Sequence, residues 1–308
     1  MPVRTARKVR LSDLGEFGLI NRIKKQIGKL SSVVCGVGDD AAVVPLSSGK
    51  YLLLTTDMLV EGVHFTKKMS AKAIGHKAIA ASISDIAAMG GTAKYAVISI
   101  GVPATCSRQF ILALYQGIKK TAKIFHVSIV GGDTVRSNKM IVNVALTGEA
   151  KSNEVVYRNG ARKGDQIFVT GPLGKSLLSG WHLRFVPRIA QASYLVKKCR
   201  PTSMIDISDG LVADLGHILD ESRVGAIVEE SLIPYRRGAR LKNAFYDGED
   251  FELLFTLSSS QARKFQKQAR KSYQFYRIGE IVDRRKGFQI KSAKGILKKV
   301  SVGGYTHF

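Results

Sequence analysis

Hydrophobic and polar positions divide the first 150 residues into alternating helices and short strands. Residues 11–30 predict an amphipathic helix, because apolar residues such as Ile23 and Ile27 recur there at helical spacing. Residues 70–89 predict a second helix, since they are rich in Ala, lack Pro and stop at Gly90-Gly91. The other expected elements are strands over residues 33–37, 51–56, 94–102, 127–130 and 140–147, and a helix over residues 107–125.

The composition turns polar and glycine-bearing around residues 151–164, which predicts a domain boundary there. We therefore expect an N-terminal domain over 1–150 and a C-terminal domain over 151–308. The second unit predicts strands over 166–170, 204–207, 226–229, 251–256 and 275–281, and helices after the 171–174 turn and over 187–198, 211–221 and 260–271. This alternation of strands and helices favours a mixed α/β or α+β fold.

Length and composition are those of a soluble globular protein. The chain has 308 residues, 45% of them hydrophobic, and no apolar run reaches the ~18 residues of a membrane span. No signal peptide is expected, because no apolar segment follows the basic N-terminus. Three widely spaced cysteines, at positions 35, 106 and 199, fit neither a disulfide framework nor a zinc knuckle. These features together predict a cytoplasmic protein.

The net charge of +24 is unusual. It suits a nucleic-acid binder, a membrane-surface protein or an enzyme of phosphorylated substrates, and equally a proteome rich in Lys and Arg. Charge alone does not choose among them.

Candidate chemistry lies in the aspartates. Most of the fourteen fall at the end of an expected strand or in a glycine turn, where loops carry function. A single such motif is more often a turn than a site, but five in one chain favour a site. Carboxylates spread over several loops can converge on Mg²⁺ and one triphosphate, which predicts phosphoryl transfer. The ten clustered aspartates are 39, 40, 57, 85, 133, 206, 209, 214, 247 and 250.

The stretch Ser128–Thr134 illustrates both interpretations. Its Gly131-Gly132 pair lets backbone N–H groups approach a phosphate, and Asp133 offers a hard oxygen ligand to Mg²⁺. The alternative is a plain Gly-Gly-Asp turn between two strands. Neither a Walker A motif nor a protein-kinase glycine loop is present in the sequence.

These motifs, in their order and spacing, resemble thiamine-monophosphate kinase. The family belongs to an ATP-binding superfamily with selenophosphate synthetase and phosphoribosyl-aminoimidazole synthetase, which share the fold but not this set of motifs. The resemblance runs from about residue 12 to the chain end and rests on residues 15–20, 36–41, 55–65, 84–90, 131–134, 205–211, 248–253 and 304–308.

The resemblance implies transfer of the ATP γ-phosphoryl group to thiamine phosphate, giving thiamine diphosphate. It also implies a two-domain aminoimidazole-ribotide-synthetase-like fold, whose N-terminal sheet pairs across a homodimer. The Mg²⁺ ligands it implies are Asp40, Thr55, Thr56, Asp57, Asp85, Asp133, Asp206 and Asp209. Gly132, Asp133, Arg158 and Ser208 would hold ATP, His64, Glu249 and Tyr305 would face the thiamine moiety, and Asp57, Asp133 and Arg158 would act in catalysis.

No general base is required, because the acceptor phosphate is already anionic. Arg158 suits a phosphate clamp through its planar fork, although it could equally be a solvated cation of a basic linker. The segment 171–184 departs from the family pattern, with Lys175 where an acid is usual and a shortened helical part, so no contact is assigned to it.

Two alternatives remain at this stage. One is another small-molecule kinase or synthetase of the same superfamily, with a different acceptor. The other is an RNA-binding protein on a degenerate kinase scaffold, because residues 261–300 hold thirteen Lys and Arg against two acids with aromatics between them. The aromatics also fit core positions, so nucleic-acid binding is the weaker interpretation, and no membrane partner is expected.

Overall fold

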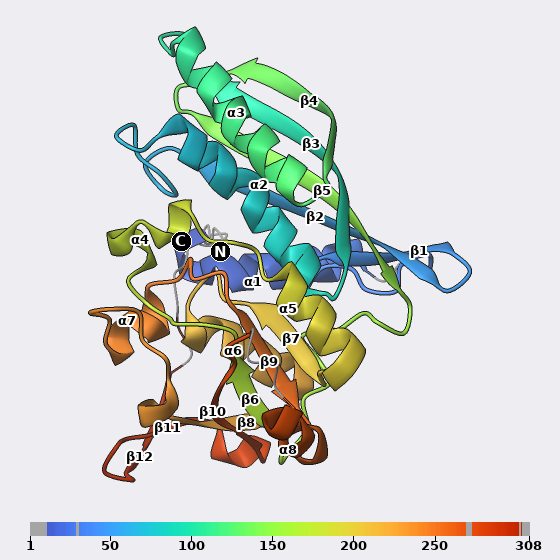
Figure 1. The fold of residues 1–308 in the computed structure, drawn as a ribbon, viewed down its shortest axis with the longest axis vertical. Helices are drawn as coiled ribbons and strands as arrows, with labels where there is room; N and C mark the ends of the chain where they lie inside the picture. Colours follow the sequence, from blue (N-terminus) through green and yellow to red (C-terminus); the bar gives the residue numbers. More distant parts are fainter. Residues whose placement is uncertain (1–10, 29–30, 269–272, 302, 304–308) are drawn as a thin grey trace, which may run out of the picture.

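The computed structural model describes residues 11–28, 31–268, 273–301 and 303, and two mixed sheets form its two halves (Figure 1). The N-terminal half holds a five-stranded sheet in the order β1-β2-β5-β3-β4, with one parallel pair, β3 and β4. Its elements are α1 (Leu11–Ile27), β1 (Ala42–Ser47), β2 (Lys50–Val60), α2 (Ala71–Ala88), β3 (Thr92–Val102), α3 (Arg108–Ile124), β4 (Ser128–Arg136) and β5 (Ile141–Lys151).

The C-terminal half holds a seven-stranded sheet in the order β12-β11-β8-β10-β6-β9-β7. Within the described residues, no helix is long and apolar enough to cross a membrane. The strands are β6 (Gln166–Val169), β7 (Ser203–Asp206), β8 (Gly225–Glu229), β9 (Leu253–Leu257), β10 (Tyr276–Val282), β11 (Phe288–Lys291) and β12 (Leu297–Lys299). The helices are α4 (Ser176–Ser179), α5 (Ile189–Tyr194), α6 (Leu211–Ser222), α7 (Leu241–Tyr246) and α8 (Ser259–Gln268), with short 3₁₀ or π turns at η1 (Trp181–Leu183), η2 (Leu195–Cys199), η3 (Glu230–Leu232) and η4 (Arg284–Lys286).

Helix α2 connects the two halves. Its Ile74, Ile79 and Ile83 pack in the core of the N-terminal half, whereas Ala87 and Ala88 pack with the aromatic core of the C-terminal half. A helix buried on nearly all sides needs small residues, which explains the Ala-rich sequence. The packing of α2 against both halves therefore fixes the positions of its buried polar side chains, Lys77, Ser82 and Ser84.

Two glycines allow α2 and α3 to touch through their backbones. A Cβ on Gly75 would lie 2.1 Å from the carbonyl oxygen of Leu114, and one on Gly117 would lie 2.0 Å from that of Lys72. Only glycine permits such an approach. The close contact fixes the helix that carries Lys77 and Asp85.

The structure corrects three expectations from the sequence. Residues 33–37 do not form a strand but make isolated bridges, such as Cys35 with Val43, because Gly36 and Gly38 interrupt the apolar run. The Gly131-Gly132-Asp133 stretch is no turn, since β4 continues through it to Arg136 in parallel pairing with β3. The elements β1, α7, β11 and β12 were not expected, and each is short or turn-flanked.

Candidate functional site

Three aspartates from three segments meet between the two halves. Asp40 lies in the bend before β1, Asp85 lies in α2, and Asp206 ends β7. One carboxylate oxygen of each lies within 4.8 Å of the others. Like charges this close repel strongly away from water, so the cluster is stable only with protons or a cation between the carboxylates. We name Asp40, Asp85 and Asp206 the central cluster.

Hydroxyl groups on neighbouring elements orient these carboxylates. The hydrogen bonds run from Thr55 Oγ1 to Asp85 Oδ2 (2.5 Å), from Ser84 Oγ to Asp206 Oδ2 (2.6 Å) and from Ser82 Oγ to Asp57 Oδ2 (2.7 Å). Asp57 acts electrostatically on Asp85 and so adjoins the central cluster from β2. Each donor leaves other carboxylate lone pairs for a ligand, as a metal site requires.

Burial and mutual repulsion raise the pKa values of the cluster. Burial raises the pKa of Asp206 to about 8, with the charge of Asp40 adding to the effect. The pKa of Asp85 is raised well above its usual value, first by burial and then by the charges of Asp57 and Asp206. The pKa values of Asp40 and Asp57 are raised mainly by burial. Hard divalent cations bind such oxygen sets, and a bound cation would lower these pKa values.

Arg158 borders the central cluster. Its Nη2 donates to Asp40 Oδ1 at 2.5 Å and its Nε to the same oxygen at 3.2 Å, while its backbone N–H donates to Asp39. The guanidinium thus orients Asp40 and lines a cavity of about 680 Å³ together with Ser208. Asp40 Oδ2 is buried and has no hydrogen-bond partner among the described residues, so this oxygen is available to coordinate a cation.

A second group of metal-type ligands lines the same cavity. Oxygen or nitrogen atoms of Asp209, Asp214 and His217 lie within 4.8 Å of one another. Burial, followed by the charge of Arg158, lowers the pKa of His217 to about 4, and burial raises that of Asp214 well above its usual value. Sequence reasoning assigned a role only to Asp209. The signal for the other two was their spacing of one helical turn on α6.

A second cavity, of about 390 Å³, opens beside the first. It is lined by His64, Lys77, Glu249 and Phe251, and reaches Asp57 and Ser208. The predicted substrate-facing residues His64 and Glu249 are thus brought together next to a predicted metal ligand. Sequence reasoning missed Lys77, whose only signal was a single Lys on the inward face of an apolar helix.

Three predicted metal or ATP ligands lie apart from the central cluster, and one predicted substrate contact is not described. Thr56 faces the opposite side of β2 from Asp57 and donates to Asn143 Oδ1 at 3.2 Å. Gly132 and Asp133 lie on β4, an edge strand that is largely exposed. Tyr305 lies outside the described residues.

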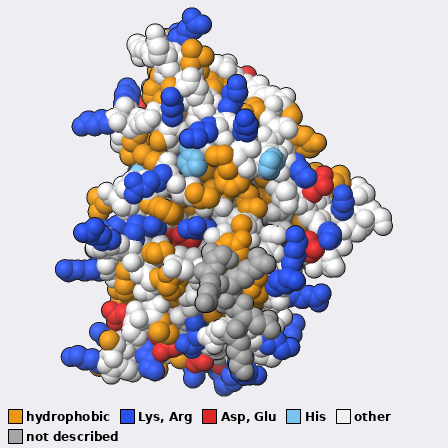
Figure 2. All heavy atoms as spheres, in the orientation of Figure 1, with side chains coloured by type: hydrophobic (Ala, Val, Ile, Leu, Met, Phe, Trp, Pro, Cys, Tyr) orange, Lys and Arg blue, Asp and Glu red, His pale blue; other side chains and the backbone are white. Residues whose placement is uncertain are grey.

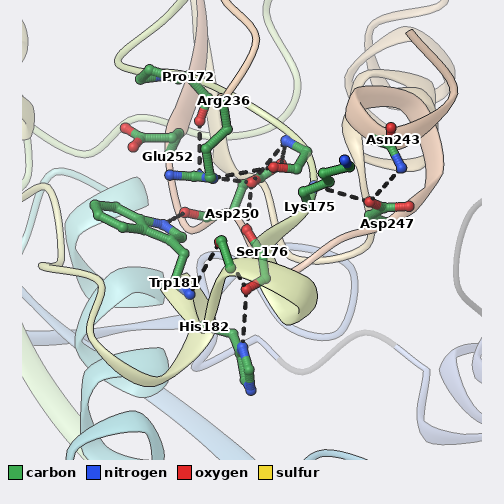
Figure 3. A network of polar contacts seen from close by, with 12 residues as sticks. Pro172, Lys175, Ser176, Trp181, His182, Arg236, Asn243, Asp247, Asp250 and Glu252 are labelled. Carbon is green, nitrogen blue, oxygen red and sulfur yellow. Dashed lines mark hydrogen bonds and ion pairs between the residues drawn. The ribbon is translucent and has the colours of Figure 1, made fainter. Parts of the chain in front are cut away.

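The segment 171–184 is anchored to the loop that carries Glu249. Asp250 accepts from Ser176 Oγ at 2.6 Å and from Arg236 at 2.9 Å, and the indole of Trp181 donates to its backbone oxygen (Figure 3). Asp250 is buried, and these donors satisfy its charge. Although this segment departs from the family pattern, it still contacts the loop that carries Glu249 and Asp250.

Comparison with known proteins places this architecture in a defined class. The family model of the AIR synthase related protein N-terminal domain matches residues 38–150, and that of the AIR synthase related protein C-terminal domain matches residues 149–291. Hydrogenase maturation protein HypE shares the fold, with a TM-score of 0.71 at 20% identity over 86% of this chain and 92% of HypE. The chain is therefore an AIR synthase-related protein with two domains.

Within this class, the most informative relatives are kinases. Thiamine-monophosphate kinase of Aquifex aeolicus is 38% identical over 80% of this chain and 87% of its own, and that of Bacillus subtilis is 32% identical over 96% and 100%. The structure of AaThiL complexed with AMPPCP and TMP superposes with a TM-score of 0.84 at 33% identity, covering 98% of this chain and 100% of that one. The chain belongs to the thiamine-monophosphate kinase family.

Proposed function

We propose that this protein transfers the γ-phosphoryl group of ATP to the phosphate of thiamine monophosphate. The products are thiamine diphosphate and ADP. A phosphate oxygen of the acceptor forms the new P–O bond, and the bond between the γ-phosphorus and the bridging oxygen of ATP breaks. The observation that carries the proposal is the convergence of the central cluster next to Arg158, which lines one cavity, and Asp57, which lines the other, in a member of this kinase family.

The two cavities suit the two substrates. The 680 Å³ cavity, with Arg158 and Ser208, would take ATP, and the 390 Å³ cavity, with His64 and Glu249, would take thiamine monophosphate. Both include Ser208 and Asp209, so the phosphates of the two ligands would meet there. Tyr305 is retained as a predicted contact of the thiamine moiety.

The carboxylates would hold several Mg²⁺ ions. The proposed Mg²⁺ ligands are Asp40, Asp57, Asp85, Asp206 and Asp209, with Thr55 contributing an oxygen atom. Thr56 and Asp133 are retained as predicted ligands, and Gly132 is retained as a predicted contact of ATP. When bound, Mg²⁺ neutralises charge on the phosphates and stabilises the transition state. The hydroxyls of Thr55 and Ser84 orient the cluster, and Arg158 holds Asp40 and faces the ATP cavity. No side chain has to remove a proton, because the attacking phosphate is anionic.

We also propose a homodimer in which the five-stranded sheet faces a second copy. One face of the sheet is covered by α2 and α3, while the other exposes apolar side chains, namely Leu54, Met58, Tyr95 and Val97. An exposed patch of this kind favours an interface. Pairing of β1 with β2 stops at Leu54, so among the described strands residues 55–60 pair with β5, and their other edge can meet a strand of a second copy.

The RNA-binding alternative is weaker in the structure. Phe265 is buried and packs edge-on against Phe168 and Phe275, so these aromatics fill a core rather than offering a stacking surface. Figure 2 shows Lys and Arg side chains spread over the visible face rather than gathered in one stripe. A cytoplasmic location remains an expectation.

The test is a product assay with purified full-length protein, ATP, Mg²⁺ and thiamine monophosphate. Thiamine diphosphate and ADP should form in equal amounts. Formation of ADP without thiamine diphosphate would support another acceptor within the same superfamily. If neither product appears with folded protein, the proposal is wrong.

A further inference from the structure

Lys77 is a fully buried cation in helix α2, and the residues next to it on the inward face are apolar. It has 0% exposure, and its neighbours along the inward face are Ile74, Ala78 and Ala81. Removing an ammonium group from water is costly unless charged and polar partners surround it. An apolar side chain of similar length would satisfy the packing of α2, so the charge itself must serve a contact.

Two contacts use this charge, and they join both halves of the chain. Lys77 Nζ donates to the backbone oxygen of His64 at 2.8 Å and to Glu249 Oε1 at 2.5 Å. His64 follows β2 in the N-terminal half, whereas Glu249 precedes β9 in the C-terminal half. Lys77 therefore fixes the two residues of the 390 Å³ cavity that are proposed to face thiamine.

Glu249 is held in an uncommon backbone conformation. Its φ is +56°, in the left-handed region that a residue with a Cβ rarely adopts, and its N–H donates to the backbone oxygen of Ser208 at 2.6 Å. Strained residues of this kind persist where the surroundings hold them, and they gather at functional sites. With Oε1 engaged by Lys77, the other oxygen, Oε2, is buried and has no hydrogen-bond partner among the described residues.

His182 presents a second buried acceptor near the same pair. The residue is 1% exposed, and its Nδ1 lies 3.1 Å from the backbone oxygen of Ser176, to which an N–H there donates (Figure 3). In that tautomer Nε2 is an acceptor, and it has no partner within the part of the chain that the structure describes. Lys77 and Glu249 both act electrostatically on this ring, and burial lowers its pKa, which keeps it neutral.

We propose that Lys77 is the positioning residue of the thiamine end of the site: it neutralises Glu249 and holds Oε2 as an acceptor for the exocyclic amino group of the substrate's pyrimidine ring. The inference rests on the proposed function. An acceptor that is buried and already paired on its other oxygen accepts N–H donors selectively, because a ligand without them leaves it unsatisfied. Lys77 would thereby favour a pyrimidine ring that carries an amino group over one that carries an oxo group, without contacting the phosphates.

The test compares two acceptors that differ only at this group: thiamine monophosphate and oxythiamine monophosphate, whose amino group is replaced by an oxo group. Steady-state kinetics would be measured for the wild type, Lys77→Met and the matched control Lys72→Met, which removes an exposed cation from the same helix. Lys77→Met should raise KM for thiamine monophosphate at least tenfold and leave KM for ATP within about threefold. It should also reduce the preference for the amino form over the oxo form at least tenfold, and Lys72→Met should change neither.

A double variant separates positioning from folding. Lys77→Met with Glu249→Gln removes both charges, so no carboxylate stays buried and unpaired, and its Tm should recover toward the wild type. KM for thiamine monophosphate should nevertheless stay raised. A fall in kcat with both KM values and the amino preference unchanged, in the single and the double variant, would overturn the inference.

Calorimetric binding of thiamine monophosphate, with AMPPCP and Mg²⁺ present, gives a readout that does not depend on turnover. If the wild type binds but does not turn over, the proposed function fails, while a tenfold weaker affinity in Lys77→Met still supports the inference. If the wild type turns over and Lys77→Met binds normally, the inference alone fails. If the wild type does not bind thiamine monophosphate at all, both fail.

Discussion

Asp57 and Gly132 lie in one row of the five-stranded sheet but on strands three places apart. Asp57 on β2 is opposite Val144 on β5, Val144 is opposite Ile98 on β3, and Ile98 is opposite Gly132 on β4. Three inter-strand spacings separate them by roughly 14 Å. Asp133, the next residue, therefore cannot ligate the same ion as Asp57 within one chain, since Mg²⁺–oxygen distances are about 2 Å.

This separation leads to a prediction about assembly. If Gly132 and Asp133 of one copy complete the site that Asp57 of the other begins, each dimer has two shared sites. Asp57→Asn and Asp133→Asn homodimers should each be inactive, while a heterodimer of the two variants holds one intact site. When the two variants are co-expressed and pair at random, about half of the dimers are heterodimers, and each of these has one intact site out of two. The mixture should therefore recover about one quarter of wild-type activity.

The heterodimer can be isolated with two different affinity tags, and its activity compared with that of each homodimer. Recovery to about half of the wild-type value per dimer would confirm shared sites. If two inactive variants stay inactive as a verified heterodimer, both aspartates act within one chain. An active Asp133→Asn homodimer would instead show that Asp133 has no role.

The raised pKa values predict how stability depends on pH. Asp206 has a folded pKa of about 8 against 3.8 when unperturbed, so between these values the folded state binds the extra proton. In metal-free protein this contribution to stability is complete below about pH 4 and is lost as pH rises to about 8. The free energy of unfolding falls by no more than about 1.4 kcal/mol per pH unit for each such proton. Mg²⁺ should reverse the loss.

Thermal unfolding at pH 6 and pH 8, with EDTA and with Mg²⁺, measures this dependence. Tm in EDTA should be lower at pH 8, and the increase on adding Mg²⁺ should be larger at pH 8 than at pH 6. Equal increments at the two pH values would contradict a proton-binding carboxylate cluster at the metal site.

Asp85→Asn should separate stability from activity. Asp85 is repelled by Asp57 and Asp206, so removing its charge should raise Tm of the metal-free protein at pH 8. Loss of a ligand at the centre of the cluster should lower kcat by about 100-fold or more. Asp283→Asn, in a surface ion pair with Arg285 outside both cavities, is the matched control and should leave kcat within about twofold and Tm within about 1 °C. A less stable Asp85→Asn protein would contradict the repulsion argument.

The backbone contact between α2 and α3 predicts sensitivity at a glycine outside both cavities. Gly75→Ala would place a Cβ 2.1 Å from the Leu114 oxygen, so the helices must separate. We expect a loss of about 1–3 kcal/mol in the free energy of unfolding, measured by urea titration. Gly49→Ala, where a Cβ would meet nothing within 4 Å but φ is +72°, tests backbone strain without the clash and should cost less.

Short sequence motifs predicted all three residues of the central cluster. Asp40, Asp85 and Asp206 were each expected as metal ligands, and the structure brings them together from three segments. The family resemblance and the two-domain fold are confirmed by the comparisons. The individual ligand roles stay predictions.

The residues that sequence reasoning missed are those whose meaning depends on burial. Lys77 looks like any lysine of a basic chain until the structure shows that its side chain lies on the buried face of α2. His217 and Asp214 become a group only when α6 places them beside Asp209. The Gly131-Gly132-Asp133 stretch reads locally as a turn, but the parallel partner β3 holds it extended, which is a tertiary effect.

Transfer of a label tests the central claim most directly. With ATP labelled at the γ-phosphorus, thiamine monophosphate and Mg²⁺, the label should appear in the terminal phosphate of thiamine diphosphate. It should not appear on the protein, and Asp85→Asn should slow the transfer by about 100-fold or more. Label retained on a side chain, or released only as inorganic phosphate, would contradict direct transfer between two substrates at the aspartate cluster.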